Sequence, residues 1–302
     1  MRVPFLQATL IPVILGGVIA WQVVKVFRWD LFLLTLLGAI LIQIATNMFN
    51  DYFDFKSGND LQVKHQNPFA GGGRILTAGL ITPTKHFLVS SAFLLLGCLI
   101  GLYFVFVQGL TSLFWLGLIG VISSYFYVGA PFKLAHRGIG ELIVGLNFGP
   151  VMTLGAYYVQ TGTWTSVTEP FLASIPIGLL IGAVLWINEF PDMEADKAVG
   201  KKTLVLRLGY ARSIRVYVGL VSGAYVLILV YALLAVFTSL QVTILPTLIA
   251  LVSVPLALRA VRVLRANYND ANTIIPANGT TIMLHLSFGI LAILGFVIGI
   301  LV

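Results

Sequence analysis

The chain has 302 residues, of which 59% are hydrophobic and only 10% are charged, and it carries a net charge of +7. This balance, with a mean hydropathy of +0.99, excludes a soluble globular enzyme and identifies an integral membrane protein. The single cysteine, Cys98, excludes a disulfide within the chain and a cysteine-based metal cluster.

Apolar runs of roughly 20 residues, the length that a hydrocarbon core of about 30 Å demands, recur along the whole chain. They predict an all-α integral membrane protein with nine transmembrane helices and a single domain, residues 1–302. The predicted spans are residues 4–26, 30–50, 86–107, 111–130, 138–160, 170–190, 212–237, 242–265 and 277–302.

The connections after the second and sixth spans are long, polar and acidic. The clustered residues are Asn47, Asn50, Asp51 and Asp54 in the first acidic segment (residues 47–54) and Asn188, Glu189, Asp192 and Asp196 in the second (residues 188–196). Helical spacing places each set on one face. Helix capping by Asp and Asn would explain one such cluster. Two clusters beside a membrane core indicate a functional site.

The basic residues predict the topology. Sixteen of the eighteen Lys and Arg residues fall on the side that holds the N-terminus, and only Lys25 and Arg28 fall on the other. The positive-inside rule therefore puts the N-terminus and both acidic segments in the cytoplasm, and nine spans put the C-terminus outside. An even number of spans separates the two acidic segments, so they share one side and can form one site.

The chemistry of these acids suits a divalent cation. Mg²⁺ prefers octahedral oxygen coordination and usually takes one or two carboxylates, with waters and substrate phosphate oxygens in the other positions. The candidate metal ligands are Asp51, Asp54, Asp192, Asp196 and Asn50. Two bound Mg²⁺ ions would leave positions open for a diphosphate and would neutralise its charge as it leaves. Asn47, Asn50, Asn188 and Glu189 are candidate substrate-binding groups around the metals.

Cationic residues follow the acids along the chain. Arg74 ends a Gly-Gly-Gly-Arg stretch, in which glycines let the backbone approach an anion and Arg offers two parallel donors to phosphate. Lys133, with Arg137 close behind it, also suits a diphosphate oxygen. Lys201 and Lys202 are expected to anchor their loop at the lipid surface.

Two tyrosines lie at the cytoplasmic end of the fourth span. The ring faces of Tyr125 and Tyr127 could stabilise a carbocation by cation–π attraction. Aromatic residues at a membrane interface are the alternative explanation for both.

The motifs together resemble a known family. Asn-x-x-Asn-Asp-x-x-Asp at 47–54, followed by Gly58 and Asp60, and Asp192-x-x-x-Asp196 are similar to the paired motifs of the UbiA superfamily of intramembrane prenyltransferases. The Gly-Gly-Gly-Arg stretch, Arg-Gly-x-Gly-Glu at 137–141 and Asn-Gly-Thr-Thr at 278–281 resemble the 1,4-dihydroxy-2-naphthoate prenyltransferases, the MenA type. Those enzymes usually read Asn-Asn-x-x-Asp at the second motif, where this chain has Glu189.

The resemblance implies a nine-helix bundle around a central cavity, capped by two cytoplasmic loops. It implies transfer of a polyprenyl group from its diphosphate to an aromatic acceptor, 1,4-dihydroxy-2-naphthoate, in menaquinone biosynthesis. Mg²⁺ would assist ionisation of the diphosphate to an allylic cation, which the acceptor ring attacks, and the carboxyl group leaves as CO2. The residues implied to be catalytic are Asp51, Asp54, Asp192, Asp196, Tyr127 and Lys133. The expected partners are the two substrates and the bilayer, and no nucleic acid.

Two alternatives stay open. The same prenyl chemistry could use 4-hydroxybenzoate, homogentisate, haem or a glycerol phosphate lipid as the acceptor. A cation transporter could use the acids as an ion path, but transporter acids usually lie near mid-membrane on broken helices. Acids at helix ends, interleaved with Arg and Lys, suit a diphosphate better.

Overall fold

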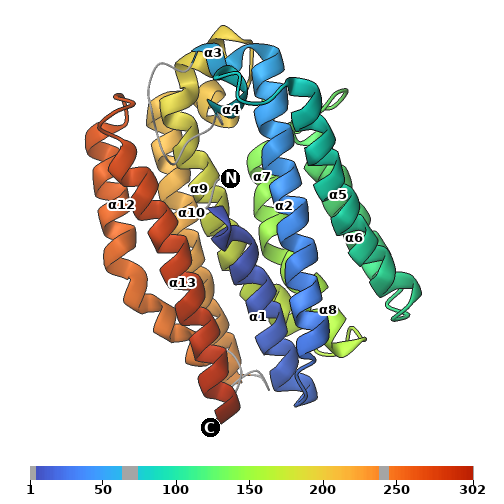
Figure 1. Cartoon of the computed structure of the whole chain (residues 1–302). Coiled ribbons are helices and arrows are strands. Elements are labelled where there is room, and N and C mark those ends of the chain that lie inside the picture. The colour runs from blue at the N-terminus through green and yellow to red at the C-terminus, as the bar shows by residue number, and fades with distance from the viewer. Residues whose placement is uncertain (1–4, 63–73, 238–244, 302) are drawn as a thin grey trace.

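The computed structural model describes residues 5–62, 74–237 and 245–301, and every regular element in these ranges is helical. Long helices run side by side along one axis (Figure 1). Helices suit a membrane because each backbone polar group finds its partner within its own segment. The elements are α1 (Gln7–Val24), α2 (Trp29–Ser57), α3 (Asn59–Gln62), α4 (Arg74–Thr77), α5 (Pro83–Phe106), α6 (Leu113–Phe126), η2 (Leu134–Arg137), α7 (Gly140–Leu146), η3 (Asn147–Val151), α8 (Met152–Thr161), α9 (Thr168–Ala198), α10 (Leu204–Phe237), η4 (Leu245–Ser253), α12 (Val254–Asn267) and α13 (Ile275–Leu301).

Seven helices in the described part of the chain are long and apolar enough to cross a membrane, which makes this a multi-pass membrane protein. They are α1, α2, α5, the continuous α7–η3–α8, α9, α10 and α13. The other two predicted spans, 111–130 and 242–265, correspond to shorter elements. Helix α6 has only 14 residues. Residues 242–244 of the second span lie outside the described residues, and its remainder is divided between the 3₁₀ turns of η4 and the Arg-rich helix α12.

Helices α2 and α9 run past their predicted ends at residues 50 and 190, to Ser57 and Ala198. Helix α2 stops at Gly58, whose φ of +78° lies in the left-handed region that favours glycine, and whose N–H donates to the carbonyls of Asp54 and Phe55. Both acidic segments therefore lie within helices. These helices end together near α3 and α4, whereas the C-terminal end of α13 lies at the opposite end of the bundle (Figure 1).

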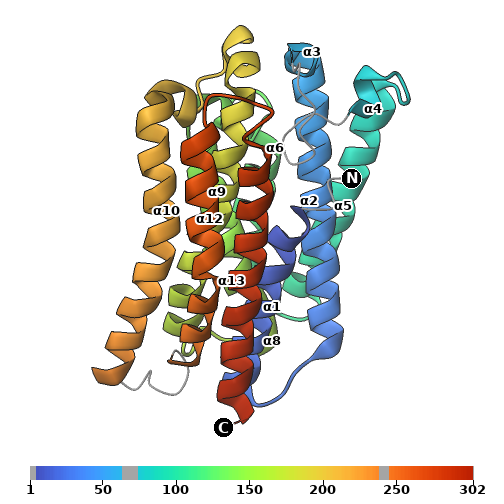
Figure 2. The same ribbon diagram turned by 90° about the vertical axis from the view of Figure 1, so that its left-hand side faces the viewer.

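The largest buried apolar cluster joins α1, α9, α10, α12 and α13. Helices α2 and α5 pack against each other on the other side of α1. Figure 2 shows α10 at one edge of the bundle and α5 at the other. This division leaves α1, α2 and α9 in the middle, where the central cavity opens.

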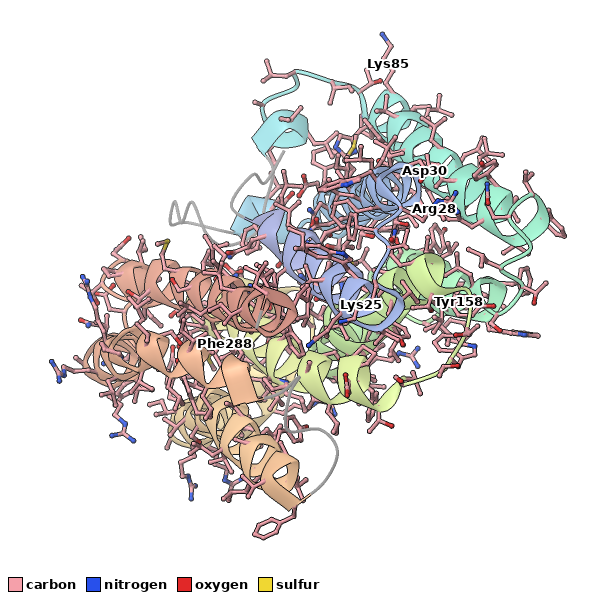
Figure 3. All side chains as sticks on the ribbon, turned by 90° about the horizontal axis from the view of Figure 1, so that it is seen from below. Lys25, Arg28, Asp30, Lys85, Tyr158 and Phe288 are labelled. Carbon is pink, nitrogen blue, oxygen red and sulfur yellow. The ribbon has the colours of Figure 1, made fainter. Side chains whose placement is uncertain are left out.

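The end opposite α3 and α4 carries the two basic residues assigned to the outer side. Lys25 and Arg28 lie in the α1–α2 connection, and Arg28 is beside Asp30 (Figure 3). Arg28 donates from Nη2 and Nε to Asp30 at 2.9 and 3.2 Å in an exposed ion pair. Exposed pairs of this kind add little to stability.

Glycines bring α7 and α9 into backbone contact. A Cβ atom on Gly178 of α9 would lie 2.5 Å from the Gly145 carbonyl oxygen and 3.5 Å from the Gly149 Cα. Backbone atoms cannot move aside cheaply, so only glycine fits at this crossing. The close approach holds α9 against α7 and η3, which also line the cavity.

The close contact predicts the effect of one added methyl group. Gly178→Ala should destabilise the fold by about 1–3 kcal/mol, the usual cost of overpacking, and should lower the unfolding temperature in detergent. Gly219→Ala on α10 is the matched control, because a Cβ there meets no atom within 4 Å. The control should stabilise the protein slightly, by up to about 1 kcal/mol, because alanine favours a helix more than glycine does. Equal unfolding temperatures for the two variants would show that α7 and α9 do not cross as closely as described.

Candidate active site

A central cavity of about 380 Å³ extends from the acidic ends of α2 and α9 into the bundle. Its walls come from α1, α2, α5, α6, α7, η3, α8 and α9, and they are mainly apolar. The polar residues that line its acidic end are Asn47, Asn50, Asp54, Asn59, Asp60, Tyr127, Asn188, Glu189, Asp192, Asp196, Lys201 and Thr203. The structure thus joins both acidic segments in one site, as the even number of spans between them predicts.

One ammonium group connects the two acidic segments. Lys201 Nζ lies 2.9 Å from Asp54 Oδ1 on α2 and 3.2 Å from Asp196 Oδ1 on α9. The Lys201 side chain is only 11% exposed. Asn59, placed by the turn at Gly58, donates from Nδ2 to Asp196 Oδ1 at 3.3 Å. Two carboxylates from distant parts of the chain therefore share one buried cation.

Lys201 does not lie where the sequence predicts. We expected Lys201 to anchor its loop at the lipid surface, but the structure buries it between two acids, and only Lys202 is exposed. Burial on its own would lower the pKa of the Lys201 ammonium, but Asp54 and Asp196 raise that pKa above its ordinary value. The ammonium therefore keeps its charge throughout the physiological pH range.

His136, in η2, is the titratable neighbour of this bridge. Burial and the charge of Lys201 lower the pKa of His136 to about 4. The imidazole is therefore neutral at physiological pH and does not add a second positive charge beside Lys201. The His136 backbone carbonyl accepts a hydrogen bond from the Lys202 N–H at 2.9 Å, which fixes the loop that carries the bridge.

A proline orients the second acidic segment. Pro191 lies inside α9 and has no N–H to donate to the Ile187 carbonyl, which leaves that carbonyl without its helical partner. Asn278 of α13 supplies the missing bond from Nδ2 at 3.1 Å, and the same Nδ2 donates to Asn188 Oδ1 at 2.7 Å. The substitute bond thereby also fixes the direction of the Asn188 side chain, which lines the cavity.

A second acidic contact holds the start of α10. Glu141 of α7 accepts a hydrogen bond from the Leu204 N–H on Oε1 at 3.0 Å. The Glu189 carboxyl interacts with the side chains of Glu141 and Thr203. The loop between α9 and α10, which carries Lys201, is therefore tied to α7 as well as to the acids.

Several predicted site residues lie away from the cavity. Asp51, Tyr125, Lys133 and Arg137 do not line it. Asp51 acts electrostatically on His86 of α5. Tyr125 packs against the ring of Phe49, with centroids 5.5 Å apart.

Two of these residues are exposed, and one more predicted residue, Arg74, is described only in part. Lys133 and Arg137 are exposed, and Arg137 donates to the Pro131 carbonyl at 3.3 Å. Arg74 begins α4, and its side chain lies outside the described residues, as do Gly71, Gly72 and Gly73.

The acidic end offers oxygen ligands that fit Mg²⁺. No group of three or more Asp, Glu, His or Cys residues in the described ranges lies close enough together to hold a metal ion. Mg²⁺ bound to a diphosphate needs only one or two carboxylates. Asp54 and Asp196 supply one each, and the neighbouring Asn59 Oδ1 is buried without a hydrogen-bond partner. This donor set, hard oxygens beside an open cavity, suits a hydrated magnesium ion.

Several known proteins are similar to this chain in sequence. The model of the UbiA prenyltransferase family matches residues 9–279. The chain is 35% identical to the 1,4-dihydroxy-2-naphthoate octaprenyltransferase of Bacillus subtilis (strain 168) over 73% of this chain and 68% of that protein. It is 33% identical to the enzyme of the same name from Mycobacterium tuberculosis (82% and 79% covered) and to the 2-carboxy-1,4-naphthoquinone phytyltransferase of Synechocystis (69% and 64%).

One solved structure has a similar fold. A structure described for digeranylgeranylglyceryl phosphate synthase aligns with a TM-score of 0.58 and 20% identity, over 97% of this chain and 91% of that one. At this identity the match establishes the arrangement of helices and nothing more.

Because Lys201 lies between Asp54 and Asp196, removing its ammonium group should lower the stability of the fold. Lys201→Met leaves two carboxylates buried together without compensation, and should destabilise the protein by about 3 kcal/mol. Lys202→Met, one residue away and exposed, is the matched control and should have little effect. Thermal unfolding in detergent measures both.

A second substitution separates the loss of the charge from the loss of packing. Adding Asp54→Asn to Lys201→Met removes one of the two unpaired carboxylates and should recover part of the lost stability. An unfolding temperature for Lys201→Met equal to that of Lys202→Met would contradict the buried bridge.

Proposed function

Because the chain belongs to the UbiA prenyltransferase family, we propose that it transfers a polyprenyl group from its diphosphate to 1,4-dihydroxy-2-naphthoate within the cell membrane. The observation that carries the proposal is the apolar cavity that ends at two acidic helices. The polar end suits a diphosphate with its magnesium ions, and the apolar walls suit a prenyl chain. The product would be a precursor of menaquinone.

The acceptor is proposed from the relatives. Two of the named proteins carry 1,4-dihydroxy-2-naphthoate in their names, one from Bacillus subtilis and one from Mycobacterium tuberculosis. Glu189, where the naphthoate enzymes usually have Asn, lines the cavity and leaves room for another acceptor, such as 4-hydroxybenzoate, homogentisate or a glycerol phosphate lipid. A cation transporter is a poorer explanation, since Lys201 would block an ion path between the acids.

Magnesium, when bound, would neutralise the charge that develops on the departing diphosphate. Asp54, Asp192, Asp196 and Asn50 are the residues of this chain that would hold it, because all four line the acidic end of the cavity. Asp51, also predicted as a ligand, lies on α2 but does not line the cavity, so it would not contact the metal directly.

The chain's own groups would then govern the reaction. Lys201 would offer its ammonium to the diphosphate oxygens. The ring of Tyr127 lines the cavity and would stabilise positive charge on the prenyl carbon. Glu189 or Asp196 would accept a proton from the acceptor. The apolar walls would keep water away from the cation.

The acidic end is proposed to face the cytoplasm. Lys25 and Arg28 lie at the opposite end, and the remaining sixteen basic residues are assigned to the acidic side. Polyprenyl diphosphate and acceptor would therefore meet at the cytoplasmic face of the membrane.

Product analysis tests the proposal directly. Purified protein with Mg²⁺, labelled geranylgeranyl diphosphate and carboxyl-labelled 1,4-dihydroxy-2-naphthoate should form a prenylated naphthalenediol and release labelled CO2. Mass spectrometry identifies the product, and trapping measures the CO2. If product forms only from 4-hydroxybenzoate or homogentisate, prenyl transfer is supported and 1,4-dihydroxy-2-naphthoate is not the acceptor.

Substitution of the acids tests their role. Asp54→Asn and Asp192→Asn should each lower the rate of prenyl transfer by roughly 10²-fold, on the scale of losing one charge-stabilising group. Asp30→Asn, in the exposed pair at the opposite end, should leave the rate unchanged. Full turnover by either of the first two variants in excess chelator would refute the assignment.

A further inference from the structure

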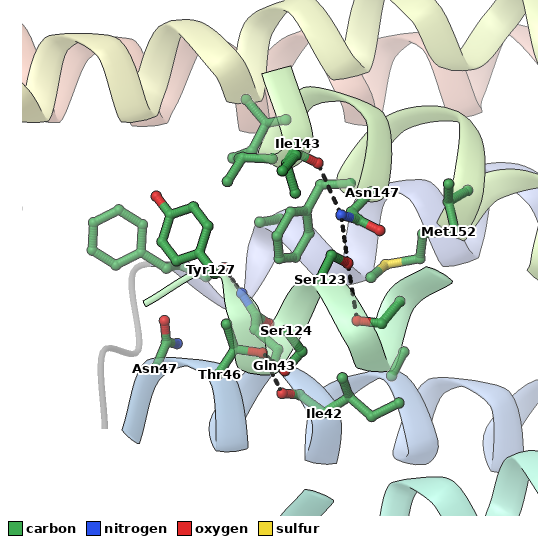
Figure 4. A pocket seen from close by; sticks show the side chains of 18 of the residues that line it. Ile42, Gln43, Thr46, Asn47, Ser123, Ser124, Tyr127, Ile143, Asn147 and Met152 are labelled. Carbon is green, nitrogen blue, oxygen red and sulfur yellow. Dashed lines mark hydrogen bonds between the residues drawn. The ribbon is translucent and has the colours of Figure 1, made fainter. Parts of the chain in front are cut away.

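Polar side chains inside the cavity bond to one another, whereas a group of arginines on the outside of the bundle does not. Within the cavity, Asn147 donates to Ser123 Oγ and the Ile143 carbonyl at 2.9 and 3.0 Å, and Thr46 and Ser124 share a hydrogen bond (Figure 4). On the outside, five arginines of α10 and α12 make no hydrogen bond or ion pair with any residue that the structure describes. We call this group the arginine edge, and its members are Arg212, Arg215, Arg259, Arg262 and Arg265.

The three arginines of α12 lie on the face that points away from the bundle. The buried residues of this helix, which belong to the largest apolar cluster, are Ala257, Ala260 and Leu264. With 3.6 residues per turn, Arg259, Arg262 and Arg265 fall on the opposite face, and all three are exposed. Helix α12 is therefore amphipathic, and its charged face is turned towards whatever surrounds the protein.

Helix α10 repeats this arrangement beside α12. Near the same end of the bundle it buries Ser213 and Tyr217, whereas Arg212 and Arg215 are exposed. The two helices contact each other and lie at one edge of the bundle (Figure 2). Side chains tipped with nitrogen point outward from this edge in the view along the bundle (Figure 3). The five arginines thus form one positively charged surface.

This surface lies at the depth of the lipid headgroups. Residues 282–302 contain no Asp, Glu, Lys or Arg, and about 20 residues cross the hydrocarbon core, so the core ends near Thr281. Thr281 follows the start of α13 at Ile275 by six residues, about 9 Å of helix. Helix α12 ends at the same level (Figure 2), and the same rise counted back along it reaches Val261. The three arginines of α12 therefore lie within about 6 Å of the boundary.

Membrane topology explains the side on which these residues lie but not their type. The positive-inside rule counts Lys and Arg alike. Residues 203–302 nevertheless contain six arginines, no lysine and one acid, Asp270, and the seven lysines assigned to the cytoplasmic side all come earlier. The sixth arginine, Arg207, donates to the Arg137 carbonyl. Arginine differs from lysine in offering two parallel N–H donors that match a phosphate group.

We propose that the arginine edge binds the headgroups of anionic phospholipids in the leaflet at the acidic end of the bundle. A face that points into the bilayer at headgroup depth meets lipid, and the phosphodiester is the lipid group that matches a guanidinium. In a zwitterionic lipid the headgroup ammonium offsets the phosphate charge, whereas phosphatidylglycerol leaves that charge uncompensated. Bound headgroups would supply the negative partners that the described part of the chain does not give these five arginines.

Lipid binding to the purified full-length protein tests the inference. Fluorescent phosphatidylglycerol is titrated in nonionic detergent, and unlabelled phosphatidylglycerol or phosphatidylcholine competes for the protein. The wild type should prefer phosphatidylglycerol by at least roughly tenfold, since each basic residue near a membrane surface contributes about fivefold. This preference should shrink in 1 M salt, where charges are screened beyond about 3 Å.

Two variants with the same loss of charge separate the arginine edge from net charge. Combining Arg259→Gln, Arg262→Gln and Arg265→Gln should weaken binding of phosphatidylglycerol by roughly 10- to 100-fold and leave phosphatidylcholine unaffected. Combining Lys56→Gln, Lys85→Gln and Lys202→Gln removes three exposed charges elsewhere on the same side and should keep the wild-type preference.

A third variant covers a failure to fold or insert, which thermal unfolding in detergent would detect. Replacing the same three arginines of α12 by lysine keeps every charge, and therefore the topology signal. It should still weaken binding of phosphatidylglycerol by roughly threefold or more, because an ammonium lacks the two parallel donors.

Four outcomes overturn the inference. They are no preference for phosphatidylglycerol in the wild type, a preference unchanged in the folded arginine variants, an equal loss in the lysine-to-glutamine variant, and displacement of the labelled lipid by inorganic phosphate at the concentration at which phosphatidylglycerol displaces it. The third would show that net charge alone attracts the lipid, and the fourth that the surface binds any phosphate. Preference lost only in the arginine variants, and resistant to inorganic phosphate, supports a lipid site.

Discussion

A buried ammonium between two carboxylates is the interaction on which the site depends. Two unit charges 4 Å apart interact by about 4 kcal/mol near a protein surface, so Asp54 and Asp196 would repel each other strongly without a cation. Lys201 supplies that cation and joins α2 to α9. The turn at Gly58, which brings Asn59 to Asp196, and the Glu141 contact with the start of α10 support the same bridge.

The sequence predicted the broad organisation because that organisation follows from composition. Apolar length locates the helices, and the even number of spans between the acidic segments places Asp54 and Asp196 at one end. The inner contacts depend on how each helix is rotated and which neighbour it meets, which a single sequence does not reveal. Asp51 and Tyr125 match Asp54 and Tyr127 in residue type and lie close to them in the sequence, yet only Asp54 and Tyr127 line the cavity.

Two missed residues had signals that could have been used. Pro191 in the second acidic segment requires a substitute donor for the Ile187 carbonyl, and Asn278 is a buried amide that provides it. Lys201 follows Gly200, whose positive φ turns the chain back after α9, so a lysine there can reach the helix end that it has just left. Lysines in long polar loops are usually solvated, and for that reason the charge of Lys201 alone predicted a position at the lipid surface.

The account divides the cavity between an acidic end for diphosphate and an apolar remainder for hydrocarbon, and direct binding tests this division. Equilibrium binding of labelled geranylgeranyl diphosphate and of the matching prenyl alcohol should be measured on wild-type protein, with Mg²⁺ and with excess chelator. The account predicts that chelation weakens binding of the diphosphate by at least roughly tenfold, a loss of about 1.4 kcal/mol, and leaves the alcohol unaffected. Diphosphate binding that does not respond to chelation would contradict it.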